Sequence, residues 1–229
     1  MDILNLIESL KTKPQEYVDS INRQYESFLD YSELPNVCRG FNDVNILPPK
    51  LKKLYANIAA AISGRYNFLF CFGNLNNIDY LCSLFLNKYF IDSIEHDTIL
   101  EHVLYIDTKL LIEDYKRLMN YNKNEDYLPP VHSLDTLFHR IENAPVIFWD
   151  KFSRIDSLYD KDKLLDIITI RNRKGLSNFY FVEGKSSELG SKLGITLCDL
   201  ISQHMDVGYD CFNYNIKINH TKEADLFIC

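Results

Sequence analysis

The sequence predicts an α/β fold in which helices cover both faces of a parallel sheet. Four short runs are almost entirely apolar, at 67–72, 102–106, 145–149 and 178–182. Strands buried on one face alternate between apolar and polar residues, so continuous runs indicate strands that are covered on both faces. Segments with helical spacing of apolar residues separate these runs, which is the chain order of a parallel sheet with crossover helices.

The first 33 residues predict a helical arm that is interrupted near Pro14. Apolar and aromatic side chains recur at helical spacing on both sides of the proline. The next stretch, 34–49, has prolines at both ends and is interpreted as a linker or an extended arm laid on the following domain. The α/β domain itself is expected to occupy 50–229. The apolar positions of the arm are Ile3, Leu6, Ile7, Leu10, Tyr17, Ile21, Tyr25 and Phe28.

Helices and strands are expected to alternate within 50–229. The expected helices carry apolar residues three or four positions apart, such as Leu81, Leu84 and Phe85. Gly64 marks the end of the first of them. We expect helices at 50–63, 77–90, 108–120, 133–142, 161–173 and 187–205, and strands at the four apolar runs and, near the end of the chain, at 212–218 and 224–228.

Composition excludes several classes of protein. The 25 basic and 32 acidic residues give a formal charge of -7, so the chain is not a general nucleic-acid coat, although a local basic face stays open. No apolar run approaches the roughly 20 residues that cross a bilayer. The N-terminus lacks the basic start of a signal peptide, and the cysteines and histidines lack metal-site spacing. We expect a cytoplasmic protein with no membrane contact and no metal.

The turn after the first strand is the usual phosphate site of such folds, because backbone N–H groups at the next helix start point toward it. A phosphate-binding loop requires the pattern G-x-x-x-x-G-K-[ST]. On that frame Gly73 holds the first position and Ile78 replaces the second glycine. Asp79 stands in the position of the lysine, and Tyr80 in that of the Ser or Thr.

Several anchor segments occur in the order of one family. They are Leu34-Pro35, Phe68-Leu69-Phe70-Cys71-Phe72-Gly73, Val103-Leu104-Tyr105-Ile106, Pro145-Val146-Ile147-Phe148-Trp149-Asp150, Asn178-Phe179-Tyr180-Phe181-Val182 and Glu188-Leu189. In this order they resemble the AAA+ domain of bacterial replicative helicase loaders of the DnaC and DnaI type, and the related IstB transposition ATPase. The resemblance covers roughly residues 34–205. It implies a P-loop NTPase-like sheet and a role in DNA replication.

The chain departs from that family at the positions that handle nucleotide. Asp150 holds the place of the magnesium-side acid, but Lys151 replaces the acid that would activate water. Gly184 lies near the place of a polar sensor residue, and Asp199 near that of a trans-acting arginine. ATP brings about four negative charges, so a carboxylate at Asp79 would repel it. We expect nucleotide binding and hydrolysis to be lost, and no cofactor.

Two alternatives stay open at this stage. One is an active ATP-dependent loader or nucleotide hydrolase, with ATP and magnesium held at a shifted site built on Asp150 and on Asn76 or Asn77. The other is an α/β domain outside the AAA+ class, in which 73–80 is a plain strand-to-helix connection.

A basic stretch at 151–174 contains seven Lys or Arg residues against four acids in an acidic protein. The resemblance to loaders implies contact with single-stranded DNA, and the candidate residues are Arg171, Arg173 and Lys174. These cations also lie at the end of an expected helix, where they would interact favourably with the helix dipole. A protein interface is the third interpretation.

The apolar stripe of the N-terminal arm needs a surface to pack against. It either folds back on the domain or, as the resemblance to loaders implies, docks on a replicative helicase or a helicase-associated protein. The sequence therefore predicts a DNA replication protein that resembles a helicase loader and acts by protein binding. A loader mimic that inhibits the helicase is an alternative, and the oligomeric state is left open.

Overall fold

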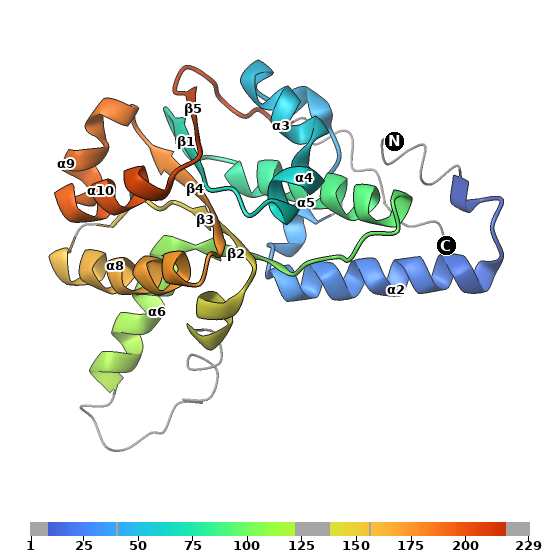
Figure 1. The fold of residues 1–229 in the computed structure, drawn as a ribbon, viewed down its shortest axis with the longest axis horizontal. Helices are drawn as coiled ribbons and strands as arrows, with labels where there is room; N and C mark the ends of the chain where they lie inside the picture. Colours follow the sequence, from blue (N-terminus) through green and yellow to red (C-terminus); the bar gives the residue numbers. More distant parts are fainter. Residues whose placement is uncertain (1–8, 40, 122–137, 156, 219–229) are drawn as a thin grey trace.

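The computed structural model describes residues 9–39, 41–121, 138–155 and 157–218. Five strands form one sheet in the order β2-β3-β4-β1-β5, and every neighbouring pair is parallel (Figure 1). The strands are β1 (Phe68–Phe72), β2 (Val103–Asp107), β3 (Val146–Asp150), β4 (Ser177–Glu183) and β5 (Val207–Cys211). The first four confirm the predicted strands to within a residue or two, and the parallel sheet confirms the predicted fold class.

Helices cover both faces of this sheet. Alternate residues of β1 point to opposite faces, with Phe68 and Phe70 in one core cluster and Leu69 and Cys71 in the other. The first cluster is completed by α2 to α5, and the second by α6 and α8 to α10. The helices are α2 (Gln15–Ser32), α3 (Lys52–Ala56), α4 (Ile58–Ser63), α5 (Ile78–Glu95), α6 (Thr108–Tyr121), α8 (Leu158–Arg173), α9 (Leu189–Leu193) and α10 (Ile195–His204).

The carboxyl ends of the strands meet at one edge of the sheet because all pairs are parallel. Asp107 and Asp150, the last residues of β2 and β3, are register partners. Phe72 and Glu183, the last residues of β1 and β4, are partners as well. In open α/β sheets ligands bind beyond this edge, so these four residues mark where a site is expected.

Three predicted elements differ from the structure. The helix at 50–63 is a 3₁₀ turn followed by two short helices that meet at Asn57. The helix at 187–205 is divided at Gly194, whose φ of 83° is a left-handed value that favours glycine. The strand predicted at 212–218 is wrong, because the fifth strand is β5. The strand at 224–228 and the start of the helix at 133–142 lie outside the described residues.

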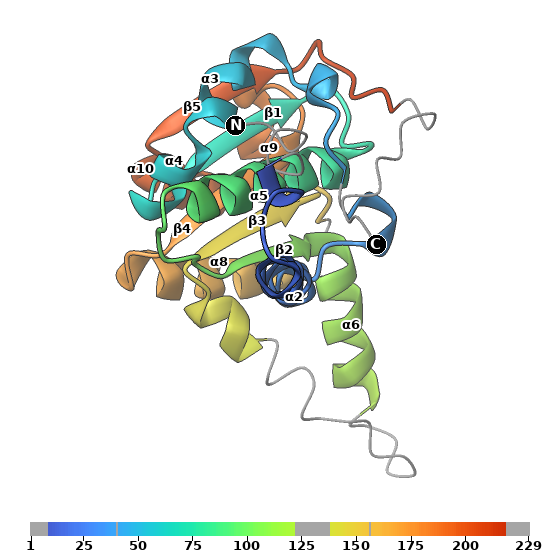
Figure 2. The same cartoon turned by 90° about the vertical axis from the view of Figure 1, so that its right-hand side faces the viewer.

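The N-terminal helix α2 belongs to the α/β body. It lies beside the edge strand β2, as its end-on view in Figure 2 shows. Ile21, Tyr25 and Phe28 are buried there, and the Tyr25 hydroxyl donates a 2.6 Å hydrogen bond to Asn87 of α5. The expectation that these three side chains contact a partner is therefore wrong, because α5 and the edge of the sheet already cover them. Folding back on the domain was the competing interpretation.

The other apolar residues of the arm have a different environment. Leu10 is half-buried and packs against the same core, whereas Tyr17 is exposed. Ile3, Leu6 and Ile7 lie outside the described residues. Partner binding by these five residues stays a prediction.

The stretch 34–49 is laid on the α/β body. It contains two short 3₁₀ turns, Asn36–Cys38 and Val44–Ile46. Cys38 is buried, and the backbone carbonyl of Phe41 accepts a 2.7 Å hydrogen bond from the side chain of Asn87. These contacts match the second of its two interpretations, an extended arm.

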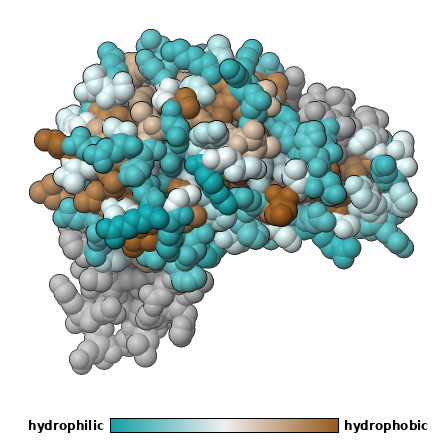
Figure 3. Space-filling view, in the orientation of Figure 1, coloured by the Kyte–Doolittle hydropathy of each residue, from teal (hydrophilic) through white to brown (hydrophobic). Residues whose placement is uncertain are grey.

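The face of the molecule in Figure 3 is mostly hydrophilic, and its hydrophobic side chains occur in small separate groups. Large exposed hydrophobic residues elsewhere in the described chain are likewise spread over several elements, for example Val37, Ile99 and Ile195. Among the described helices, none is both long and apolar enough to cross a membrane.

Candidate functional site

The turn between β1 and α5 brings the predicted nucleotide-site residues together. It begins at Gly73, and the backbone N–H of Gly184 at the end of β4 donates a 2.8 Å hydrogen bond to the carbonyl of Phe72 directly before it. The ends of β2 and β3 lie alongside. This region is called the β1–α5 corner below. Its predicted members are Gly73, Ile78, Asp79, Tyr80, Asp150, Lys151 and Gly184.

Carboxylates surround a single ammonium group in this corner. The Lys151 ammonium forms an ion pair with Asp107 and lies 3.8 Å from the nearer carboxylate oxygen of Asp150. Asp150 also accepts a 2.7 Å hydrogen bond from the Tyr105 hydroxyl and one of 2.7 Å from the Lys151 backbone. The charge of Asp79 acts on Lys151 as well. Sequence reasoning missed Asp107, although its place at a strand end was a usable signal.

The pKa values in the corner follow from burial. Desolvation raises the pKa of Asp150 to about 6, even though the Tyr105 hydrogen bond and Lys151 act in the opposite direction. Burial raises the pKa of Asp79 as well. Burial disfavours the Lys151 ammonium, but the hydrogen bond to Asp107 and the charge of Asp150 outweigh it, so the pKa of Lys151 is raised. At neutral pH the corner is an acidic cluster neutralised in part by its own lysine.

The turn itself does not have the form of a phosphate cradle. Ile78 is fully buried at the place of the second glycine. The Asp79 carboxylate accepts a 3.0 Å hydrogen bond from the backbone N–H of Tyr80. This N–H group at the start of α5 is therefore already engaged and does not point to a free phosphate site. The Tyr80 ring packs edge-on against Phe41 with centroids 5.0 Å apart. The turn contains no lysine, serine or threonine, the residue types with which such a loop holds phosphate and magnesium.

The C-terminal segment 212–218 occupies the space above the turn. A methyl group at Gly73 would lie 2.4 Å from the carbonyl oxygen of Phe212, so only glycine allows this approach. The Asn77 side chain donates a 3.0 Å hydrogen bond to the carbonyl of Ile216, which is itself buried. The chain therefore fills the place above the turn with its own residues.

Arg171 is not available to DNA. Its side chain is fully buried, and its guanidinium donates to the carbonyls of Ile141, Ala144 and Ser177 and to the side chain of Asn178 at 2.6–2.9 Å. Burial lowers its pKa to about 9, which leaves it charged at neutral pH. The predicted DNA contact of Arg171 is therefore wrong.

The two neighbouring candidates for DNA contact are exposed. Arg173 is open to solvent, and Lys174 donates hydrogen bonds to the carbonyl of Glu142 and the side chain of Asn143 at 3.1 and 3.0 Å. Both lie at the amino edge of the sheet, near the start of β4 and away from the β1–α5 corner. DNA contact by these two residues stays a prediction.

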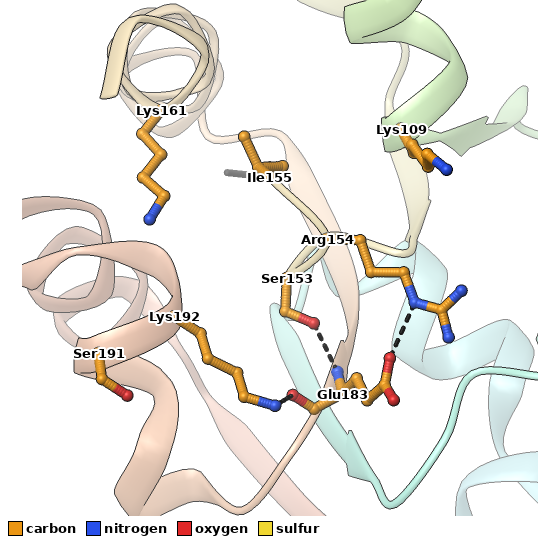
Figure 4. A pocket seen from close by; sticks show the side chains of 8 residues that line it. All are labelled: Lys109, Ser153, Arg154, Ile155, Lys161, Glu183, Ser191 and Lys192. Carbon is orange, nitrogen blue, oxygen red and sulfur yellow. Dashed lines mark hydrogen bonds and ion pairs between the residues drawn. The ribbon is translucent and has the colours of Figure 1, made fainter. Parts of the chain in front are cut away.

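A second site lies at the carboxyl edge, beyond the ends of β3 and β4. It is a cleft of about 500 Å³, called the basic cleft below (Figure 4). Its cations are Lys109, Arg154, Lys161 and Lys192, and its lining contains one acid, Glu183. Sequence reasoning grouped Arg154 and Lys161 into a basic stretch but missed Lys109 and Lys192, which follow other strands. Both lysines follow strands of a parallel sheet, and this shared position could have indicated that they lie at the same edge as Arg154.

The sequence of this chain matches no family model and no curated protein, but its fold matches solved structures. A DnaC helicase loader is 17% identical with a TM-score of 0.56, over 77% of this chain and 99% of that one. DnaI is 12% identical with a TM-score of 0.52, over 78% and 94%. The replication initiator DnaA bound to AMPPCP and single-stranded DNA is 9% identical with a TM-score of 0.55, over 78% and 51%.

At such low identities the likeness concerns the fold. The similar structures include a helicase loader and a replication initiator, the kind of protein that the resemblance in the sequence implied. The match spans nearly the whole of the DnaI and DnaC chains, so this chain shares the α/β fold of those proteins.

Proposed function

We propose that this chain is a DNA replication protein of the helicase-loader type that acts by protein binding, without a nucleotide cycle. The observation that carries the proposal is the fold it shares with DnaI and the DnaC helicase loader over almost the full length of those chains. The partner is a replicative helicase or a protein associated with it. Because fold alone does not fix function, the proposal depends on the experiment below.

The electrostatics of the β1–α5 corner support the loss of nucleotide binding. A phosphate-binding loop neutralises the triphosphate with a lysine and magnesium, whereas here Asp79, Asp107 and Asp150 share the one ammonium of Lys151. Two like charges about 6 Å apart repel by about 3 kcal/mol at an effective dielectric constant of 20. A bound triphosphate would also have to displace the segment 212–218.

The residues ahead of α2, together with Tyr17 in its first turn, supply the proposed docking surface. Ile21, Tyr25 and Phe28 hold α2 on the sheet, so α2 acts as the support. Ile3, Leu6 and Ile7, with Leu10 and Tyr17, are the residues that a partner would bury. Each fully buried aliphatic side chain contributes about 1.5–3 kcal/mol, so three or four contribute about 4.5–12 kcal/mol before the costs of ordering and association. Micromolar binding requires about 8 kcal/mol after those costs, so most of the surface must be buried by the partner.

Binding of the full-length protein to a purified replicative helicase tests the proposal. The variant carrying Ile3→Asp and Ile7→Asp should bind at least tenfold more weakly, because carboxylates replace two of the proposed apolar contacts. Deletion of residues 1–33 is a poor test, since it also removes core residues of α2.

Val37→Asp is the matched control, because Val37 is 72% exposed and lies on another segment. Circular dichroism verifies that every variant is folded. Wild-type protein that shows no affinity for any replicative helicase tested contradicts the proposal. Undiminished binding by the double variant rejects the N-terminal docking surface while leaving helicase binding intact.

A loader mimic that inhibits the helicase is the second candidate. The filled β1–α5 corner favours it, since a protein that cannot exchange nucleotide has no nucleotide-driven step for releasing its partner. A helicase loading and unwinding assay separates the two: a loader increases unwinding on covered single strands, whereas a mimic reduces it.

A further inference from the structure

The basic cleft lies where open α/β sheets bind ligands, beyond the carboxyl ends of β3 and β4. Lys109 comes from the start of α6, Lys161 from the first turns of α8, and Lys192 from α9. Together with Arg154 they place four cations around a single acid, in a protein whose formal charge is -7. A hollow lined by one sign of charge concentrates counter-ions.

Glu183 fixes two of these cations in place. Its carboxylate accepts a 2.8 Å hydrogen bond from Nε of Arg154, and its backbone carbonyl accepts one of 2.7 Å from the Lys192 ammonium. Its backbone N–H donates to the Ser153 hydroxyl at 2.7 Å. The one acid of the lining is thus engaged with Arg154, and the cations it holds are preorganised for a ligand.

Lys161 differs from the other three cations, because its ammonium forms no ion pair or hydrogen bond with a described residue. Its side chain projects into the open space between α8 and α9 (Figure 4). In the part of the chain that the structure describes, no acid pairs with it. Lys109 is only weakly engaged, with its ammonium 3.8 Å from Glu113. Cations gathered without matching acids are stabilised by a bound anion.

The lining also indicates which anion fits. None of the described lining residues is aromatic, so the cleft offers no ring on which a base could stack. Several separate ammonium groups around one guanidinium suit a compact anion of high charge. We infer that the basic cleft binds the phosphate groups of a phosphorylated ligand. A free polyphosphate and a nucleic-acid strand share that chemistry. The inference does not depend on helicase binding.

Two probes test the inference on the full-length protein at low ionic strength. Inorganic tripolyphosphate is titrated by calorimetry, and a fluorescein-labelled oligo-dT is followed by anisotropy. Lys161→Glu should weaken binding of at least one probe by about tenfold or more, and added salt should weaken it further. Loss for tripolyphosphate identifies a free polyphosphate as the source, and loss for oligo-dT alone identifies a strand.

Lys52→Glu is the matched control, because it makes the same change in charge at an exposed position of α3, on the opposite face of the sheet from the helices that line the cleft. Its affinity should equal that of the wild type. Lys161→Gln, which removes the charge without reversing it, replaces Lys161→Glu if that variant does not fold, and should weaken binding about threefold. Absence of binding by both probes, or equal affinities of the Lys161 and Lys52 variants, overturns the inference.

Discussion

The carboxyl edge of the sheet has two unlike sites, the β1–α5 corner and the basic cleft. The corner gathers Asp79, Asp107 and Asp150 around Lys151 and is filled by the segment 212–218. The cleft, beyond β3 and β4, is open and lined by four cations. Both sites lie at the same edge of the sheet. In many α/β proteins the turn after the first strand, which is the place of the β1–α5 corner here, is the phosphate site.

This difference shows what the fold leaves undetermined. Parallel strands fix where side chains meet, because all strand ends lie at one edge. The residue type at each strand end then determines the sign of the local potential. In this chain the negative potential lies at the usual phosphate position, and the positive potential lies beyond the neighbouring strands.

The largest expected effect concerns the far end of α8, the helix that carries Lys161 at its start. Arg171→Met should destabilise the protein by about 3–5 kcal/mol, because three buried backbone carbonyls lose this donor and the Asn178 side-chain oxygen keeps only its hydrogen bond from Trp149. Urea denaturation measures the free energy of unfolding. Arg173→Met, two residues away and exposed, should stay within about 0.5 kcal/mol of wild type. Equal losses of stability in the two variants would show that the buried hydrogen bonds of Arg171 do not stabilise the fold.

The second prediction tests whether the corner is really filled. Ile216→Ala should cost about 3 kcal/mol, because Ile216 is buried in the core cluster of that face. Ile195→Ala is the control, since Ile195 is 75% exposed at the start of α10. A cost near zero at Ile216 contradicts a packed segment and reopens the corner to ligands.

The third prediction uses the raised pKa of Asp150, whose ordinary value is 3.8 and whose value here is about 6. A carboxyl group that holds its proton more tightly when folded adds stability below its unfolded pKa and loses it as pH rises through the folded pKa. The stability of the wild type relative to Asp150→Asn should therefore fall by about 2 kcal/mol between pH 4 and pH 7. Denaturation of both proteins across that range measures the difference, and a constant difference contradicts the assignment.

The smallest effect concerns the contact between the turn and the segment above it. Gly73→Ala should cost about 1–2 kcal/mol, because its methyl group would lie 2.4 Å from the Phe212 carbonyl oxygen. Hydrogen exchange of the backbone amides in 212–218 should also accelerate. Gly190→Ala in α9 meets open space, and should leave stability unchanged or raise it by up to about 1 kcal/mol. If hydrogen exchange and stability are unchanged in Gly73→Ala, the segment 212–218 can shift away from the added methyl group at little cost, which contradicts the prediction.

The sequence predicted the regions that depend on continuous apolar runs. β1 to β4 were identified because strands buried on both faces have no polar residue to obscure them. β5 was missed because Val207–Cys211 is an edge strand in which only Cys211 is fully buried. The segment 207–211 has no continuous apolar run, so the last strand of the sheet was predicted at the next segment with apolar residues, 212–218.

The sequence likewise predicted some residues of the candidate site but not the long-range contacts that they make. The turn residues of the β1–α5 corner came from the phosphate-loop pattern, and Asp150, Lys151 and Gly184 came from the resemblance to helicase loaders. The structure places these residues around the same carboxyl edge of the sheet. The place of Asp107 at a strand end indicated that it belongs to the corner, but its ion pair with Lys151 joins residues 44 positions apart and is decided by the tertiary structure. The segment above the turn comes from still farther along the chain, and no local pattern records that contact.

By itself the sequence determined the class of fold, the order of its elements and the loss of the phosphate-binding pattern, because these depend on local periodicity and residue identity. The tertiary structure decided which surface each pattern meets. The stripe of α2 shows that Ile21, Tyr25 and Phe28 must be buried, but only packing decides that α5 and the edge of this sheet, and not a partner, bury them. Likewise an arginine in a basic run can be solvated or enclosed, and only the carbonyls that converge on Arg171 enclose it.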